Sequence, residues 1–202
     1  PQAVQAALNA KNRPTAVYIT SPDYTGNLAD IAGIAAVCHK AGVLLLVDNA
    51  HGAYLNFLPE SPHPIALEAD LCCDSAHKTL PVLTGGAYLH LNNNAPELLK
   101  LNARTALGLF GSSSPSYLIL QSLDAANEYL TTFSARLAAF LPKVQALKTA
   151  LQRFGYRLVG QEPLKLTLLA GSVGYSGQQL AGVLKQNGIY PEFYDKDLLV
   201  LM

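Results

Sequence analysis

The uninterrupted aliphatic run at residues 43–47 constrains the fold of this chain most strongly. A strand that is apolar at every position is typical of a parallel sheet covered on both faces, whereas a half-exposed strand alternates apolar and polar residues. Further segments that favour strands occupy residues 16–20, 70–73 and 86–91. Residues 28–40 have apolar side chains at helical spacing, and Gly42 follows as a helix cap. The alternation of strands and helices predicts an α/β fold with a mostly parallel sheet.

The remainder of the chain predicts a change of architecture near residue 155. Helical patterns occupy residues 4–11, weakly 64–68, and 115–154, where Pro142 is expected to kink or divide the helix. The patterns that follow predict a strand at 156–169, a helix at 177–187 and one or two strands at 190–202. We therefore predict two domains. Residues 1–154 form part of a large domain with a trailing interdomain helix, and residues 155–202 form an incomplete small α+β domain.

The composition excludes several classes of protein. A formal net charge of zero argues against a nucleic-acid-binding surface, which needs clustered Lys and Arg. The apolar stretches are shorter than the roughly 20 residues that a membrane span needs, and no signal segment opens the chain. Among the three cysteines, Cys72 and Cys73 are adjacent, which favours reduced core residues over a disulfide framework or a metal site. We expect a cytoplasmic protein that binds no metal, membrane or nucleic acid.

Polar side chains follow three of the predicted strands at the point where each strand ends. These clusters lie at residues 20–21, 48–51 and 75–78. In parallel sheets, ligands bind beyond the carboxyl ends of the strands. We expect parallel strands that end at Thr20, Asp48 and Ser75, with residues 86–91 antiparallel at an edge, and a ligand site where the three ends meet.

Asp48 and Lys78, thirty positions apart, indicate what that ligand is. A lysine can form a Schiff base with the aldehyde of pyridoxal phosphate, and a carboxylate can keep the ring nitrogen of that cofactor protonated. Each residue also has an ordinary interpretation. A single lysine is more often a solvated surface charge, and Asp is a favoured helix N-cap. His51 fits either the ring oxygen of the cofactor or a hydrogen-bonded interior position.

The neighbours of these two residues favour the cofactor. Ser75 and His77 offer a hydroxyl and an imidazole that can bind phosphate oxygens, and Ala50 is small enough for a ring to rest on.

Four segments together resemble the Orn/Lys/Arg decarboxylase family of fold-type I pyridoxal phosphate enzymes. They are S-P-D-Y-T-G (21–26), L-L-V-D-N-A-H-G (45–52), D-S-A-H-K-T-L-P (74–81) and S-S-S-P-S-Y-L (112–118). The likeness covers residues 14–130 and, more loosely, the P-L-K-L-T segment at 163–167 and beyond. It implies an aminotransferase-like large domain that binds pyridoxal 5'-phosphate.

The resemblance also implies roles for single residues. Lys78 matches the Schiff-base lysine, Asp48 the acid at the ring nitrogen and His51 a histidine near the ring oxygen, and these three are the expected catalytic residues. Ala50, Ser75, His77, Ser112 and Ser113 match cofactor-binding positions. The pair Ser112 and Ser113 matches hydroxyls that reach the phosphate of a neighbouring subunit, which implies a homodimer or higher oligomer with a shared active site.

The chain also departs from the family pattern. Asn49 stands where the family often has Glu, and Thr25 replaces a frequent tyrosine. The family's Gly/Ser/Thr-rich phosphate loop and its ring-stacking aromatic residue have no counterpart before Pro14. We therefore expect an internal piece of a longer enzyme, inactive by itself, because it would supply only one wall of the site.

The function predicted on these grounds is decarboxylation of lysine, ornithine or arginine to its amine. Two alternatives stay open. One is another fold-type I enzyme, such as an aminotransferase or an acyltransferase, since D-x-A-H occurs there too. The other is a truncated, non-catalytic paralogue, which the missing phosphate loop would suit.

Overall fold

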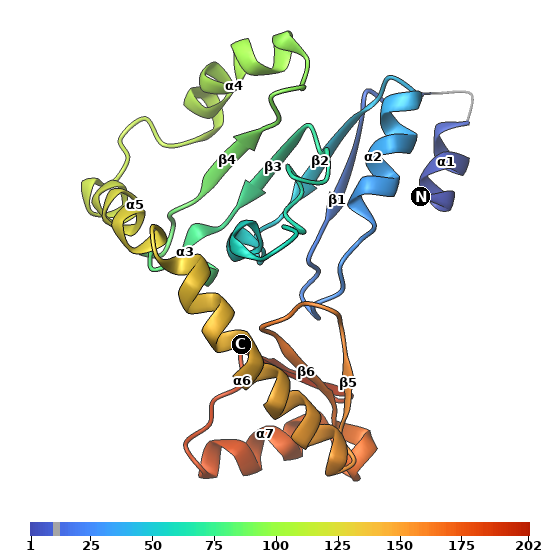
Figure 1. Cartoon of the computed structure of the whole chain (residues 1–202), viewed down its shortest axis with the longest axis vertical. Coiled ribbons are helices and arrows are strands. Elements are labelled where there is room, and N and C mark those ends of the chain that lie inside the picture. The colour runs from blue at the N-terminus through green and yellow to red at the C-terminus, as the bar shows by residue number, and fades with distance from the viewer. Residues whose placement is uncertain (10–12) are drawn as a thin grey trace. The chain divides into compact units, whose positions relative to one another are not determined.

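The chain divides by its internal contacts into two compact units. A computed structural model describes residues 1–9 and 13–202 (Figure 1). The large unit comprises residues 1–21 with 29–134, and the small unit comprises residues 22–28 with 135–202. The domain boundary expected near residue 155 stays a prediction about the longer protein.

A four-stranded sheet forms the centre of the large unit. Its strands are β1 (Ala16–Thr20), β2 (Leu44–Asp48), β3 (Leu71–Asp74) and β4 (Tyr88–Leu91), in the order β1-β2-β3-β4. The first three are parallel and β4 is antiparallel to β3. The strands end at Thr20, Asp48 and Asp74, with Ser75 next in the chain, so the expected arrangement of the sheet is confirmed.

Two helices cover one face of this sheet. Helix α1 (Gln2–Leu8) packs on α2 (Ile31–Lys40), which packs on β2 (Figure 1). Asp30 caps α2 by accepting a hydrogen bond from the Gly33 backbone N–H. Gly42 follows α2 with a φ of 63°, as expected of a glycine after a helix. The helix expected at residues 4–11 extends in part beyond the described residues.

The described residues leave the other face of the sheet largely uncovered, which corrects one expectation. Leu45 and Val47 are fully buried, whereas Leu44 and Leu46 are only half-buried, so β2 is covered on one face and not on both. Asp48 is the register partner of Cys73, and register partners on neighbouring strands point to the same face of the sheet. Leu46, two residues before Asp48, therefore lies on this face as well. Cys73 is accordingly exposed rather than a core residue like Cys72.

The helical part of the chain differs from its prediction in three ways. Residues 64–68 form turns, with Glu68 at a φ of 69° that no regular helix permits. Helix α4 (Glu97–Phe110) was not predicted, and none of its side chains is buried. The break between α5 (Tyr117–Leu130) and α6 (Phe133–Arg153) lies at residues 131–132, and α6 continues through Pro142.

The small unit is an antiparallel sheet covered by a helix. Strands β5 (Arg157–Val159), β6 (Leu166–Leu169), β8 (Leu198–Leu201) and β7 (Phe193–Tyr194) are adjacent in that order, and α7 (Gly177–Gln186) contacts β8 and β7. Leu168, Leu180 and Leu199 form its core. The single strand expected at 156–169 is two strands, because Gly160 at a φ of 84° and Pro163 turn the chain between them.

Residues 22–28, the loop after β1, belong to this small unit. The Gly26 carbonyl accepts hydrogen bonds from the backbone N–H groups of Gln161 and Glu162, and the Thr25 carbonyl accepts one from the Thr167 hydroxyl. A Cβ added at Gly160 would lie 2.6 Å from the Thr25 carbonyl oxygen and 2.9 Å from that of Gly26. The loop therefore approaches Gly160 too closely for any other residue.

Gly160→Ala is expected to lower the free energy of unfolding of the full-length protein by at least about 2 kcal/mol, through backbone strain and displacement of the loop. Gly174→Ala is the matched control, because Gly174 has a similar φ of 81° but nothing within 4 Å of an added Cβ. It should cost only about 1 kcal/mol. Denaturant unfolding measures both values, and equal losses would mean that the contact with the loop contributes nothing.

Candidate active site

Lys78 lies on a single helical turn, α3 (Ala76–Thr79), that begins directly after β3. Its Nζ is 3.1 Å from Nε2 of His51, which is buried in the turn that follows β2. An ammonium has only donors, so Lys78 donates this hydrogen bond and His51 accepts it. The Lys78 residue is exposed, which leaves its amine within reach of a ligand.

Asp48, the last residue of β2, presents a half-buried carboxylate at the same edge of the sheet. Its Oδ1 accepts a hydrogen bond from the Ala50 N–H at 3.0 Å, as in an Asx turn, and not at the start of a helix. Its Oδ2 accepts one from the Tyr18 hydroxyl at 3.2 Å. Burial, and then the negative charge of Asp48, raise the pKa of Tyr18, so this phenol stays protonated and donates.

The serine and histidine beside Lys78 hold the lysine loop together. Ser75 precedes α3, and its carbonyl accepts a hydrogen bond from the Lys78 N–H at 3.1 Å. His77 Nδ1 donates to the Gly86 carbonyl at 3.0 Å. Both residues lie where the sequence predicts, while their contact with a phosphate stays a prediction.

Ser112 and Ser113 make their described contacts with other residues than Lys78 and its neighbours. Both are exposed in the loop between α4 and α5, where the Ser112 hydroxyl accepts a hydrogen bond from the Ser114 N–H. In the described part of the chain, no hydrogen bond joins either serine to the residues around Lys78. Their role across a subunit interface stays a prediction.

A second polar cluster, which the sequence did not predict, lies at the end of β3. Asp74 is 2% exposed and accepts hydrogen bonds from His63, His90 and Asn49. Burial opposes its charge, but the hydrogen bonds from the two histidines outweigh burial and lower the pKa of Asp74 to about 2. The one available signal was strand periodicity. It places residues 72 and 74 on one face of β3, and their register partners on β4, residues 90 and 88, lie on the same face of the sheet.

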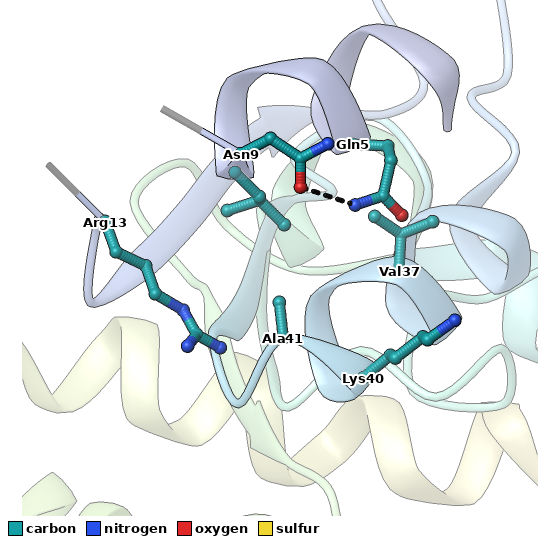
Figure 2. Close-up of a pocket in the computed structure, with 7 residues that line it drawn as sticks. Gln5, Asn9, Arg13, Val37, Lys40 and Ala41 are labelled. Atoms are coloured by element: carbon teal, nitrogen blue, oxygen red, sulfur yellow. Dashed lines mark hydrogen bonds between the residues drawn. The ribbon is translucent and has the colours of Figure 1, made fainter. Parts of the chain in front are cut away.

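A cavity in the large unit lies at the other end of the sheet. It measures about 490 Å³ between α1 and the end of α2, and Arg13 and Lys40 are among its lining residues (Figure 2). Arg13 precedes β1, and Lys40 precedes β2. The cavity is therefore at the amino ends of the strands, away from Asp48 and Lys78.

Tyr18→Phe tests the support that the tyrosine gives to Asp48. The Tyr18 residue is 66% exposed, so its loss should leave stability nearly unchanged, while the Asp48 carboxylate loses one of two donors. We expect turnover of the full-length protein to fall by up to about tenfold, the value of one modest hydrogen bond. Tyr175→Phe, a half-exposed tyrosine of the small unit, is the control. Unchanged steady-state kinetics in Tyr18→Phe would show that this hydrogen bond has no role.

Comparison with known proteins identifies the family. Residues 1–155 match the major domain of Orn/Lys/Arg decarboxylases. The chain belongs to this family. Among curated proteins it is 33% identical over 212 aligned residues to the uncharacterized protein YaaO of Bacillus subtilis, covering 98% of this chain and 43% of that protein. It is 28% identical over 200 residues to the arginine decarboxylase of the same organism, covering 92% and 40%.

Solved structures support the same fold. Serine palmitoyltransferase of Sphingomonas wittichii superposes with a TM-score of 0.76 at 16% identity, covering 98% of this chain and 52% of that one. The fold is therefore that of the fold-type I, aminotransferase-like large domain, with a small α+β unit after it. The chain spans less than half the length of the two curated relatives. Within the described residues, no helix is both long and apolar enough to cross a membrane.

Proposed function

We propose that the full-length protein decarboxylates a basic amino acid with pyridoxal 5'-phosphate as cofactor. The observation that supports this most directly is the pair of strand ends described above. Asp48 ends β2, Lys78 follows β3, and the Lys78 amine donates a hydrogen bond to His51 at 3.1 Å. A reactive amine and a carboxylate at one edge of a parallel sheet are the two groups that this cofactor needs.

The chemistry of the side chains present fits the cofactor. The exposed Lys78 amine can react with an aldehyde, and Asp48 offers a carboxylate for a ring N–H. Ala50 is a small residue two positions after that carboxylate, and Ser75 and His77 are polar residues close to the lysine in the chain. When bound, pyridoxal phosphate supplies a protonated ring that withdraws electrons from the bond to be broken.

The residues of this chain would act mainly on protons. His51 Nε2 can take a proton from the Lys78 ammonium through the hydrogen bond that already joins them, which frees the amine as a nucleophile. Asp48 would hold a proton at the ring nitrogen by a charge-assisted hydrogen bond. Lys78 would return a proton to the substrate carbon after carbon dioxide leaves.

A basic amino acid is proposed as substrate from membership of the family and from likeness to the arginine decarboxylase of B. subtilis. We further propose that Ser112 and Ser113 bind the phosphate of a neighbouring subunit in a homodimer or larger assembly. A cytoplasmic location is proposed with the same function.

Product analysis of the full-length protein tests this proposal. The protein is incubated with pyridoxal phosphate and lysine, ornithine or arginine, each with and without a 2-oxo acid. Release of carbon dioxide and the matching amine, independent of the oxo acid, is the expected result. Amino transfer that requires the oxo acid would place the protein in another class, and no product from any substrate would favour a non-catalytic paralogue.

A further inference from the structure

Asp74 lies on the face of the sheet opposite Asp48. Asp48 pairs in register with Cys73, so the next residue of β3 points to the other face. There Asp74 Oδ2 is 3.1 Å from Nε2 of His63 and 3.0 Å from Nε2 of His90. A buried carboxylate with this many donors is a stable anion near neutral pH.

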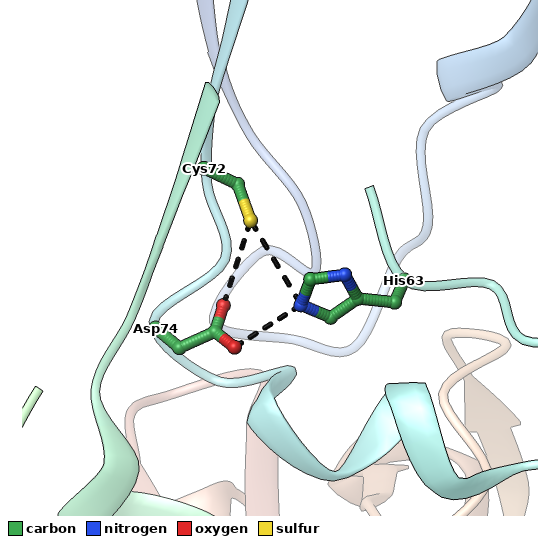
Figure 3. Close-up of side chains that lie close together, drawn as sticks. All are labelled: His63, Cys72 and Asp74. Atoms are coloured by element: carbon green, nitrogen blue, oxygen red, sulfur yellow. Dashed lines mark hydrogen bonds and ion pairs between the residues drawn. The ribbon is translucent and has the colours of Figure 1, made fainter. Parts of the chain in front are cut away.

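The neighbouring thiol raises the question of a metal ion. Ligand atoms of His63, Cys72 and Asp74 lie within 4.8 Å of one another (Figure 3). However, Nδ1 of His63 accepts a hydrogen bond from the Ile65 N–H at 3.3 Å, so Nε2 carries the ring proton and donates to Asp74. Burial also raises the pKa of the Cys72 thiol, which disfavours the thiolate that a metal needs. These contacts favour a network of hydrogen bonds.

Asn49 connects this network to the candidate active site. It is fully buried, and its Nδ2 donates to Asp74 Oδ1 at 2.6 Å. Its N–H donates to the Cys73 carbonyl, and its own carbonyl accepts from the Gly52 N–H. A side chain at position 52 would overlap Asn49 Oδ1, so the amide packs directly on the Gly52 backbone. Asn49 is thus fixed by side chain and main chain together.

The turn at residues 48–52 carries two of the residues to which the proposed function gives a role, Asp48 and His51. Asp48 begins it, and His51 within it accepts the hydrogen bond from Lys78. We infer that Asp74 is a positioning residue that fixes this turn through Asn49. The inference rests on the proposed function, because it assumes that Asp48 and Lys78 are the two residues that bind the cofactor.

Asp74→Asn in the full-length protein tests the inference. Loss of the anion weakens the hydrogen bond that Asn49 donates to residue 74, so the turn at residues 48–52 is expected to shift. This shift should lower kcat by roughly 10- to 100-fold and change the visible absorbance of the lysine-bound cofactor. The matched control is Asp70→Asn. Asp70 is also buried and accepts from a histidine, His39, and from the Leu45 N–H, but it lies at the opposite end of the same two strands. It should lower the melting temperature and leave kcat and the spectrum unchanged.

An exchange of the two side chains separates positioning from simple structural damage. Asn49→Asp alone places two carboxylates face to face and should be at least as harmful as Asp74→Asn. In the double variant, the amide now at position 74 can donate to the carboxylate now at position 49, while its carbonyl oxygen still accepts from His63 and His90. The double variant should therefore recover kcat to within about fivefold of wild type, together with the wild-type spectrum.

Three outcomes would overturn the inference. They are an unchanged kcat and spectrum in Asp74→Asn, equal losses in Asp70→Asn, and a tightly bound stoichiometric Zn²⁺ in purified wild type that Asp74→Asn removes. The wild-type spectrum is recorded first. No lysine-bound cofactor in wild type counts against the proposed function, whereas a normal wild-type spectrum with an unaltered Asp74→Asn variant counts against the positioning role alone.

Discussion

Lys78→Ala in the full-length protein is expected to remove the visible absorbance of lysine-bound pyridoxal phosphate and to lower turnover by at least about 1000-fold. The Lys78 amine is the nucleophile that holds the cofactor in the proposed mechanism, and alanine leaves His51 Nε2 without that donor. Absorbance spectra and initial rates of carbon dioxide release measure both effects. The residue is exposed, so the fold should persist.

Lys40→Ala is the control for this substitution. Lys40 is also an exposed lysine, but it ends α2 at the amino side of the sheet, where it lines the cavity of Figure 2. It should leave absorbance and rate at wild-type values. A Lys78→Ala protein that keeps its absorbance and turns over normally would assign the cofactor to another lysine.

Asp48→Asn is expected to lower turnover by about 100- to 1000-fold while the fold and most cofactor binding persist. The amide oxygen of Asn can still accept the hydrogen bond from the Ala50 N–H, and its NH2 group can donate to the Tyr18 hydroxyl, so the turn should survive. It has no charge with which to stabilise a protonated ring nitrogen, and that electrostatic effect is the expected loss. Steady-state kinetics with saturating cofactor measure it.

Asp30→Asn is the matched control, because Asn and Asp are nearly equal as helix N-caps. Asp30 caps α2 through the Gly33 N–H and lies outside the candidate site. Its kinetics and stability should match wild type. If Asp48→Asn gave a rate close to that of Asp30→Asn, Asp48 would be only a turn residue.

Much of the large unit could be predicted from the sequence because its strands are short apolar segments, and the first two are separated by a segment with apolar residues at helical spacing. β1, β2, β3 and the antiparallel β4 lie where the pattern indicates. The pattern could not reveal which faces of the sheet are covered by other segments. The aliphatic run of β2 predicts two covered faces, and the described residues cover only one, because burial depends on segments that a local pattern does not contain.

Helix boundaries were predicted less well for a related reason. Pro142 suggests a break in the sequence, but α6 tolerates it, and the chain turns at residues 131–132 instead. Helix α4 was not predicted, and no side chain in it is buried. Local propensity alone does not settle where such a helix begins and ends.

The candidate site shows the same division between local and long-range information. The positions of Asp48, His51 and Lys78 could be predicted because each lies at or shortly after the end of a strand, in a motif that resembles a known family, while their roles stay predictions. The anion of Asp74 was not, because strand periodicity can align residue 90 with residue 72 but cannot show that His63 and His90 meet the Asp74 carboxylate. Only the fold brings the two histidines to one carboxylate oxygen.

Peptide mapping of the full-length protein after borohydride reduction tests most directly whether this chain holds the cofactor. Borohydride converts the link between a lysine and pyridoxal phosphate into a stable amine, which mass spectrometry can locate. The predicted result is one pyridoxyl phosphate group per chain, on the peptide that contains Lys78. A group on any other lysine, or an unmodified Lys78 in protein that carries the cofactor, would contradict the proposed site.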